Sequence, residues 1–225
     1  MDLRVIITAA GRGTRFGQAL PKQFVKLGTR SILEHTLSRF ESCSFVEEIA
    51  VVLPTDFHVV SFAKVKYVVE GKGTRAESVY EGFLKILGGN HSDKTVVLVH
   101  DGVRPFVSDE TIEKVAYGAL EYGAAIAASK VTDTIKMADS EGFVCQTVSR
   151  EFLWKAATPQ GFRVDVLLES YKRAKEQGFF TSATDEAILA EKAGFPVYII
   201  EGNPENIKIT TTADFQMAEG LLRIL

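Results

Sequence analysis

The feature that most constrains the fold is an alternation between short apolar runs and longer amphipathic segments. Runs rich in β-branched residues predict strands at 4–10, 47–54, 65–70, 95–102, 124–129 and 196–202. Segments with helical periodicity predict helices at 31–42, 75–88, 108–123, 164–178 and 184–194. Because continuously apolar strands must be covered on both faces, this order predicts an α/β fold with a mostly parallel sheet and helices on both sides.

Capping residues support the helix boundaries. Ser108 stands where an N-cap is expected, and Gly123 stands where the same helix should stop. Thr184, Asp185 and Glu186 open a further helix that is predicted to end at Gly194.

Two later segments depart from the alternation. Residues 131–148 contain two extended runs around the letters DSEG, which predicts a β-hairpin inserted late in the sheet. Two strands are too few for a core of their own, so this hairpin must pack on another surface. Residues 157–162, ATPQGF, are interpreted as an irregular connector to which the residues alone assign no chemistry.

Composition excludes several classes of protein. The 225 residues suit one large α/β domain or two small ones, and the net charge of −3 argues against a general binder of nucleic acid or anionic membranes. No apolar run approaches the roughly 20 residues that span a bilayer, and the first residues show no signal-peptide pattern. The two cysteines, Cys43 and Cys145, lack metal-site or redox spacing. We therefore expect a reduced, cytoplasmic protein.

A glycine-bearing loop follows the first predicted strand, within VIITAAGRGTRFGQALPKQF at 5–24. Gly11 and Gly13 match the start of a dinucleotide fingerprint, but Phe16 occupies its third glycine position, and the frame of a P-loop is absent. Bare backbone N–H groups at a strand exit still suit a phosphate.

Basic residues strengthen the phosphate interpretation of this loop. Arg12, Arg15 and Lys22 add positive charge, and Pro21 stiffens the approach to Lys22. The alternative is a tight strand exit with solvated basic residues, and the combined pattern favours a function.

An acidic residue follows a buried strand in LVHDGVRPF at 98–106. In open α/β sheets, ligands lie outside the carboxyl ends of strands, which is where Asp101 is predicted to lie. A carboxylate there can hold Mg²⁺, which also binds phosphate oxygens, and Arg104 is near enough in sequence to face the same phosphates. An ordinary Asp-Gly turn is an equally good interpretation of these residues alone.

Two further segments carry basic residues. The loop EGKGTRAESV at 70–79 leads into a helix with Arg75 and Ser78, although turn and cap chemistry would also explain it. The run NIKIT at 206–210 is predicted as a short apolar strand, on which Lys208 is costly unless it has an anionic partner. An edge strand with Lys208 pointing outward is the alternative.

The candidate residues share one chemistry. No Ser-His-Asp or Cys-His arrangement is evident in the sequence. Basic residues in two glycine loops and a late strand, with one strand-end carboxylate, indicate nucleotide phosphates held by Lys, Arg and a metal without a covalent nucleophile.

The motifs occur together and in order: AAGRGTRFG, PKQF, GTRAESV, HDGVRPF, DTIK, LWKAATPQGF, TDEA and NIKIT. The chain closely resembles the 2-C-methyl-D-erythritol 4-phosphate cytidylyltransferases of the non-mevalonate isoprenoid pathway over nearly all of its length. The resemblance implies a Rossmann-like, GT-A-like nucleotidyltransferase fold, with one domain over 1–225 and a β-arm at about 131–148. It also implies transfer of CMP from CTP to the sugar phosphate, with Mg²⁺, giving 4-diphosphocytidyl-2-C-methyl-D-erythritol and pyrophosphate.

The resemblance assigns roles to residues of this chain. The catalytic basic residues are Arg15, Lys22 and Lys208. The nucleotide site comprises Ala9, Ala10, Gly11, Gly13, Gly71, Lys72, Gly73, Arg75, Ser78, Asp101, Gly102 and Arg104, with Asp101 as the metal ligand. The sugar-phosphate side comprises Thr134, Arg150, Thr158 and Thr184. Relatives use the arm to form a homodimer in which arm residues reach the neighbour's site, so Thr134 or Arg150 would serve the other subunit.

Two departures keep alternatives open. Lys72 stands where the family more often has a second glycine, which bears on how the base is read. Val103 stands where ribitol-5-phosphate cytidylyltransferases often carry valine, so that enzyme is the near alternative. The REFLWKAATPQGF and TDEA segments favour the methylerythritol enzyme. A non-catalytic nucleotide-binding protein on the same fold is the distant alternative.

Overall fold

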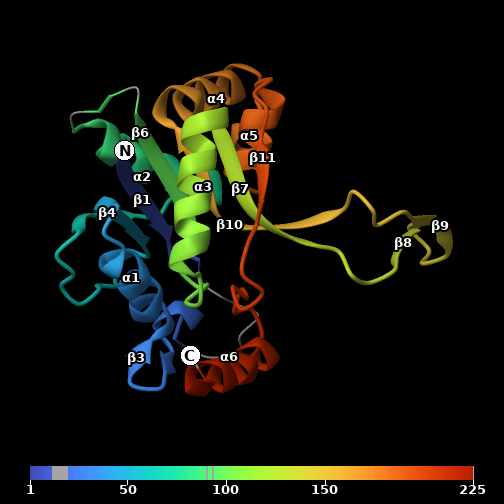
Figure 1. Cartoon of the computed structure of the whole chain (residues 1–225), viewed down its shortest axis with the longest axis horizontal. Coiled ribbons are helices and arrows are strands. Elements are labelled where there is room, and N and C mark those ends of the chain that lie inside the picture. Colours follow the sequence, from blue (N-terminus) through green and yellow to red (C-terminus); the bar gives the residue numbers. More distant parts are fainter. Residues whose placement is uncertain (12–19, 90, 93, 225) are drawn as a thin grey trace.

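The computed structural model describes residues 1–11, 20–89, 91–92 and 94–224. Its centre is a seven-stranded sheet with the order β11-β7-β10-β6-β1-β4-β5 (Figure 1). The strands are β1 (Asp2–Thr8), β4 (Val46–Leu53), β5 (Val65–Glu70), β6 (Thr95–Asp101), β7 (Ala124–Lys130), β10 (Trp154–Arg163) and β11 (Tyr198–Glu201). The six strands predicted from the alternation with helices are confirmed, and the pairings β1–β4, β1–β6, β4–β5 and β11–β7 are parallel, as predicted.

Strand β10 corrects the interpretation of 157–162 as a connector. It lies in the middle of the sheet and pairs antiparallel with both β6 and β7. Proline lacks the N–H that a central strand needs, which is why Pro159 argued against a strand here. The pairing with β7 shifts register between Ala156 and Gln160, and this irregularity accommodates the proline.

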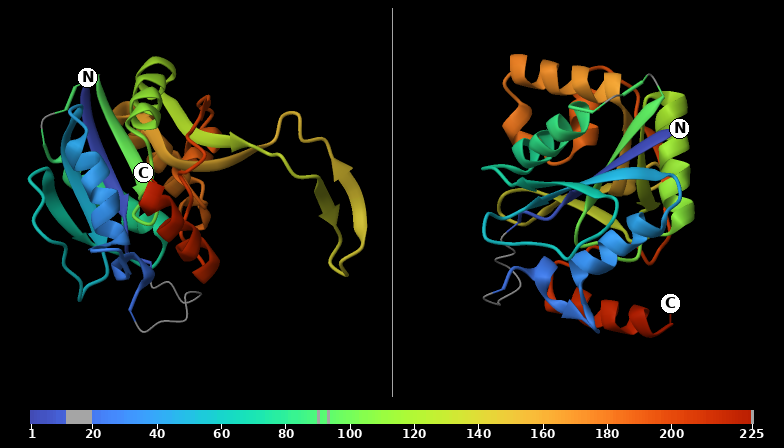
Figure 2. Two further views of the ribbon diagram at one scale, coloured as in Figure 1. Left: turned by 60° about the horizontal axis from the view of Figure 1, so that its bottom comes forward. Right: turned by 90° about the vertical axis from the view of Figure 1, so that its left-hand side faces the viewer.

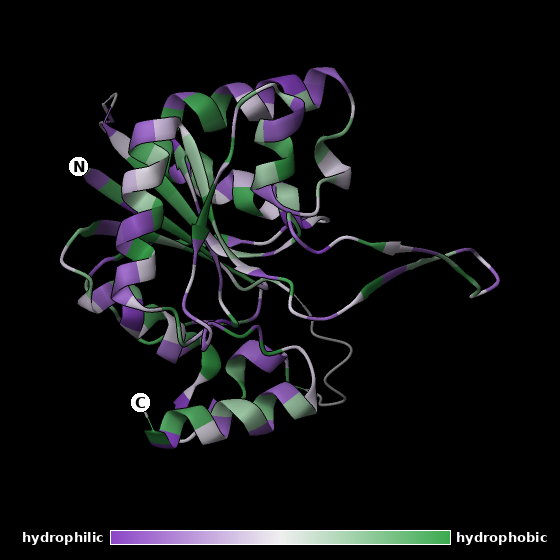
Figure 3. Ribbon diagram, turned by 45° about the vertical axis from the view of Figure 1, so that its right-hand side comes forward, coloured by the Kyte–Doolittle hydropathy of each residue, from purple (hydrophilic) through white to green (hydrophobic). Residues whose placement is uncertain are grey.

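Helices cover both faces of the sheet, as predicted. The helices α1 (Ile32–Ser42) and α3 (Asp109–Tyr122) bury their apolar residues against one face. The helices α2 (Arg75–Leu87), α4 (Val164–Glu176) and α5 (Glu186–Lys192) cover the other face (Figure 2). Figure 3 shows the resulting apolar interior along the central strands.

The predicted helix boundaries hold. The Ser108 side chain accepts a hydrogen bond from the Thr111 amide, and Gly123 ends α3 with φ of 91°. Asp185 caps α5 by accepting from the Ile188 amide, and Gly194 follows with φ of 83°. Each glycine adopts a left-handed backbone conformation that a side chain disfavours.

The predicted hairpin forms a projecting arm, composed of β8 (Ile135–Ala138), a turn and β9 (Val144–Val148). Its strands pair only with each other within the described sheets, and the arm extends away from the body rather than folding back on it (Figures 1 and 2). Three large apolar side chains of the arm, Met137, Phe143 and Val144, are at least half exposed.

A small lobe was not predicted. It contains the 3-10 turn η2 (Lys22–Phe24), the short strands β2 (Lys26–Leu27) and β3 (Arg30–Ser31), and the C-terminal helix α6 (Thr212–Ile224). Leu27, Ile32 and Ala218 share a buried cluster with Val103 and Ile209, so the lobe packs beside the end of β6. A second 3-10 turn, η3 (Phe180–Ser182), precedes α5.

The strand predicted at 206–210 is absent. Ile209 donates its amide to the Val103 carbonyl at 3.0 Å, but these residues form no ladder. Among the described helices, none is both long and apolar enough to cross a membrane.

Candidate active site

A cleft of about 510 Å³ opens at the carboxyl ends of β1 and β6. Its lining comes from five segments of the chain, and it includes ten of the predicted site residues. They are Ala9, Ala10, Gly11, Lys22, Lys72, Gly73, Arg75, Ser78, Asp101 and Lys208. Strand-end loops meet here because β1, β6 and their parallel neighbours end at the same edge of the sheet.

Asp101, the last residue of β6, is the acidic centre of the cleft. Its Oδ2 lies 3.0 Å from Lys208 Nζ and 3.1 Å from Arg104 Nε. Burial alone would raise the pKa of this carboxyl, but Lys208, Arg104 and Arg75 outweigh that effect and hold the pKa well below its usual value. The anionic partner that Lys208 was predicted to need is therefore Asp101.

A hydrogen-bonded chain holds the backbone around Asp101. Its amide donates to Thr158 Oγ1 at 3.0 Å, Thr158 Oγ1 lies 3.1 Å from His100 Nδ1, and His100 Nε2 lies 3.1 Å from the Arg104 carbonyl. Burial lowers the pKa of His100 to about 4, so the ring is neutral near pH 7. The carbonyl requires the proton on Nε2, which leaves Nδ1 to accept from the Thr158 hydroxyl.

Thr158 consequently has a structural task. It is 4% exposed, its hydroxyl is engaged by the Asp101 amide and His100, and it does not line the described cleft. Asn206 holds the same segment by donating Nδ2 to the Thr158 carbonyl at 2.8 Å. The structure thus gives Thr158 the role of shaping the end of β6.

Close backbone approach brings the two glycine loops together. A Cβ placed on Gly71 would lie 2.2 Å from the Ala10 Cβ, so only glycine fits there. The Lys72 amide donates to Ser78 Oγ at 2.9 Å, and Ser78 Oγ donates to the Thr74 carbonyl at 2.8 Å. Ser78 therefore performs the turn and cap chemistry that was its alternative interpretation, while also lining the cleft.

Gln23 holds the backbone at the start of the first glycine loop. The sequence analysis did not predict this role. Gln23 is 2% exposed, and its Nε2 donates to the Ala9 carbonyl at 2.6 Å and to the Gly11 carbonyl at 2.8 Å. These bonds fix the backbone that enters the loop, next to Lys22 in η2.

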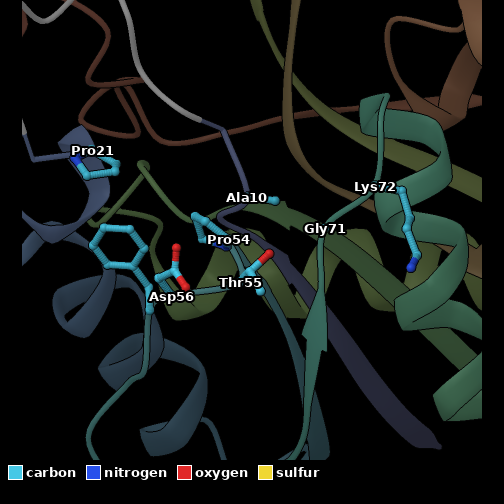
Figure 4. A pocket seen from close by; sticks show the side chains of 8 residues that line it. Ala10, Pro21, Pro54, Thr55, Asp56, Gly71 and Lys72 are labelled. Carbon is cyan, nitrogen blue, oxygen red and sulfur yellow. The ribbon is translucent and has the colours of Figure 1, made fainter.

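A second hollow of about 490 Å³ adjoins the cleft. Figure 4 shows Pro21 and Lys72 on opposite sides of it, with Ala10, Pro54 and Thr55 between them in this view. Lys72 lines both spaces, so the departure noted at this position lies where the two meet.

Several predicted site residues lie elsewhere. Arg12, Gly13 and Arg15 lie outside the described residues. Thr134, Arg150 and Thr184 are exposed and do not line the described cleft; Arg150 Nη1 donates to the Thr132 carbonyl at the base of the arm.

Gly102 and Arg104 support the cleft from behind its lining. A Cβ on Gly102 would lie 3.0 Å from the Ala9 Cβ, which keeps the β1 and β6 exits close. Arg104 Nη1 donates to the Asn206 carbonyl at 2.9 Å, and thereby ties the Lys208 segment to β6.

One carboxylate of the cleft could hold a divalent cation. The described residues contain no group of three or more His, Cys, Asp or Glu side chains suited to a metal. Mg²⁺ in nucleotide enzymes commonly uses one or two carboxylates, together with phosphates and water. The contacts of Lys208 and Arg104 are made to Oδ2, and no described residue donates a hydrogen bond to Oδ1. Asp101 therefore fits such an ion when a phosphate ligand is present.

Comparisons with known proteins agree with this geometry. Residues 3–224 match the family model described as 2-C-methyl-D-erythritol 4-phosphate cytidylyltransferase. A protein of that name from Pelotomaculum thermopropionicum is 38% identical over 227 residues, covering 97% of this chain and 93% of the relative. One from Geobacillus thermodenitrificans is 39% identical over 232 residues, covering 99% and 97%.

Solved structures give the same result. The crystal structure of the Francisella tularensis 2-C-methyl-D-erythritol 4-phosphate cytidylyltransferase superimposes with a TM-score of 0.84 at 30% identity, covering 98% of this chain and 99% of that one. The Thermus thermophilus structure of that name gives 0.82 at 34% identity, covering 99% and 100%. The chain belongs to the 2-C-methyl-D-erythritol 4-phosphate cytidylyltransferase family.

Proposed function

We propose that the chain transfers CMP from CTP to 2-C-methyl-D-erythritol 4-phosphate, releasing pyrophosphate, as a step of isoprenoid biosynthesis. The observation that carries the proposal is the meeting of Lys22, Arg75, Asp101 and Lys208 in one cleft of a chain of this family. Cationic groups from separate segments suit a ligand with several phosphates.

The chemistry needs charge neutralisation more than it needs a nucleophilic side chain. An oxygen of the sugar phosphate forms a bond to the α-phosphorus of CTP, and the bond from that phosphorus to the β-bridging oxygen breaks. A phosphate monoester is mostly a dianion at pH 7, so the attacking oxygen requires no base. The residues that line the described cleft include neither cysteine nor histidine, in keeping with direct transfer.

Lys22 and Lys208 are proposed to neutralise the negative charge of the reacting phosphates. Lys22 lies in the lobe after the first glycine loop, whereas Lys208 approaches from the late segment and is paired with Asp101. Two cations from different segments would hold two anionic reactants against their mutual repulsion and align them. Arg15 is proposed to join them by its match to the family motif.

A divalent cation, proposed as Mg²⁺, would be held by Asp101 together with nucleotide phosphates. When bound, such an ion withdraws negative charge from the phosphate oxygens and so favours attack at phosphorus. The Lys208 and Arg104 contacts keep Asp101 ionised for this role.

We also propose that the arm joins two copies of the chain. Met137, Phe143 and Val144 are exposed on a two-stranded element, and such an element is marginal in water without a packing partner. A second copy across a two-fold axis is the simplest partner. Thr134 and Arg150 would then contact sugar phosphate bound largely by the other subunit, beside Thr184.

A cytoplasmic location stays a prediction. Cys43 is buried and Cys145 is exposed, and both are free thiols, which suits a reducing compartment. Fractionation of cells that express the protein would check it.

The function is tested by pyrophosphate release with CTP and Mg²⁺, supplied with methylerythritol phosphate or ribitol 5-phosphate. Val103 lines the cleft and is the observation that favours the ribitol compound as the second candidate. We expect turnover with methylerythritol phosphate to exceed that with ribitol phosphate at least roughly a hundredfold, the scale on which a pocket discriminates by the shape of an apolar group. The reverse ratio would identify the ribitol enzyme, and no release with either would indicate a nucleotide-binding protein.

A further inference from the structure

Glu186 is a fully buried carboxylate that the mechanism above leaves without a task. It is the first residue of α5 and is 0% exposed. Arg75 Nη1 lies 2.9 Å from its Oε1 and 2.7 Å from its Oε2. Arg75 opens α2 and lines the cleft, so a buried acid on one helix grips a cleft-lining cation on another.

The central sheet fixes where the Glu186 backbone lies. Gln160 of β10 accepts hydrogen bonds through Oε1 from the Glu186 amide at 3.2 Å and the Ala187 amide at 3.1 Å. Its Nε2 donates to Asp185 Oδ2 at 2.9 Å. One glutamine thus binds both the side chain of the N-cap residue Asp185 and the first two amides of α5. The backbone that carries the Glu186 side chain is therefore anchored to the sheet.

The guanidinium of Arg75 is only partly used by this contact. Both bonds to Glu186 involve Nη1, and no described residue is a hydrogen-bond partner of Nε or Nη2. The side chain is 28% exposed whereas that of Glu186 is 0% exposed. A guanidinium carries five N–H donors in a planar fork, so donors are left for an anion in the cleft.

The energetics of buried ion pairs indicate that the Arg75–Glu186 pair does more than join α2 to α5. Burying a carboxylate is costly, and an ion pair in that setting often does no better than apolar residues of similar volume. Burial raises the pKa of Glu186 and Arg75 opposes that rise. The hydroxyl of Tyr171, which interacts electrostatically with both residues, has no hydrogen-bond partner in the described structure, so this region is not arranged to solvate a charge.

We infer that Glu186 is a positioning residue: it holds Arg75 so that the remaining guanidinium donors meet the phosphates of the nucleotide. The inference rests on the proposed function for the identity of that nucleotide. Glu186 itself is buried beneath Arg75 and acts through it. Removing the Glu186 charge should therefore weaken nucleotide binding only while Arg75 is present.

The test is a double-mutant cycle on CTP binding, measured by calorimetry with Mg²⁺ and without sugar phosphate. Glu186→Gln should weaken CTP binding roughly tenfold, a typical coupling between contacting residues. In the Arg75→Gln background the same change should have less than about a twofold effect. Glu191→Gln, at an exposed position of the same helix, is the matched control and should bind as the wild type does.

Two outcomes would overturn the inference: wild-type affinity in Glu186→Gln, or an equal loss in both Arg75 backgrounds. Melting curves establish that each variant is folded. If Glu186→Gln melts below the assay temperature, Glu186→Asp, which keeps the charge on a shorter side chain, enters the same cycle with the same expected non-additivity.

Turnover of the wild type is measured separately. A chain that binds CTP but does not transfer CMP would contradict the proposed function and leave the positioning role standing. A wild-type chain that binds no CTP would contradict both.

Discussion

Strands β6 and β9 carry similar β-branched residues, yet their surroundings are opposite. All seven residues of β6 are buried, and the strand ends in an aspartate whose contacts come from the same chain. Four of the five residues of β9 are exposed, and its described pairing is with β8 alone. Similar strands therefore form part of the buried core in the body and part of an exposed arm that projects from it (Figure 3).

This contrast indicates a division of tasks. The body supplies the cleft from one chain, whereas the arm exposes apolar residues that are not covered by the described residues of that chain. Changes in the cleft should abolish chemistry without disturbing association, whereas changes to the exposed apolar residues of the arm should weaken association itself.

The largest effect is expected at Asp101. Asp101→Asn removes the proposed metal ligand and should lower turnover about a thousandfold, at the upper end of the loss for one transition-state interaction. The dimer should persist in light scattering, because Asp101 lies in the body. Near-normal Mg²⁺-dependent turnover would reject the metal assignment.

The cleft lysines come next. Lys22→Ala and Lys208→Ala should each reduce turnover about a hundredfold, with melting temperatures close to that of the wild type. Lys26→Ala, at an exposed lysine of β2, is the control and should leave turnover unchanged. A loss that merely followed the unfolded fraction would contradict a catalytic role.

Lowering the pH should reduce the folding stability of the protein through protonation of His100. Its folded pKa of about 4 lies below the unfolded value of about 6.5, so the unfolded chain binds the proton first as the pH falls. The stability that the neutral His100 ring contributes is fully present above about pH 6.5. It is lost as the pH falls from 6.5 to 4, and about 2 kcal/mol of the free energy of unfolding is lost by pH 5.

Urea unfolding of the metal-free protein at pH 7 and pH 5 measures this loss. The exposed His91→Gln variant should keep the pH dependence, and His100→Gln should largely remove it. An equal loss in both variants would assign the acid sensitivity to other groups.

The smallest effect concerns the arm surface. Phe143 is 69% exposed, and its burial by a partner chain would be lost in Phe143→Ser. We expect the dimer to dissociate about tenfold more readily, within the contribution of one buried phenylalanine. Sedimentation velocity measures this, with the half-exposed Tyr117→Ser of α3 as the control; equal dimer affinity in both variants would place the interface elsewhere.

The sequence predicts the scaffold well, because local periodicity specifies six strands and five helices. It fails where a long-range contact overrides a local signal. Pro159 argues against a central strand, yet a register irregularity admits it to β10. Lys208 was predicted on a strand, and the structure keeps its anionic partner but not the strand.

The candidate site follows the same rule. Strand-end residues such as Asp101 and the glycine loops could be recognised from sequence because their position relative to a strand carries the signal. Gln23, His100, Gln160 and Glu186 were missed because each acts as a buried polar group whose partner lies far away along the chain. Neither their residue types nor their sequence neighbours name those partners.

The central claim is that the cleft of one chain works with the arm of another. Arg150→Ala and Lys22→Ala chains should each be nearly inactive alone. After the two are mixed and refolded, half of the dimers are heterodimers with one intact site each, so about a quarter of wild-type turnover should return. A mixture that is dimeric in light scattering but as inactive as its parents would contradict a shared site involving Arg150, and a monomer would contradict the dimer itself.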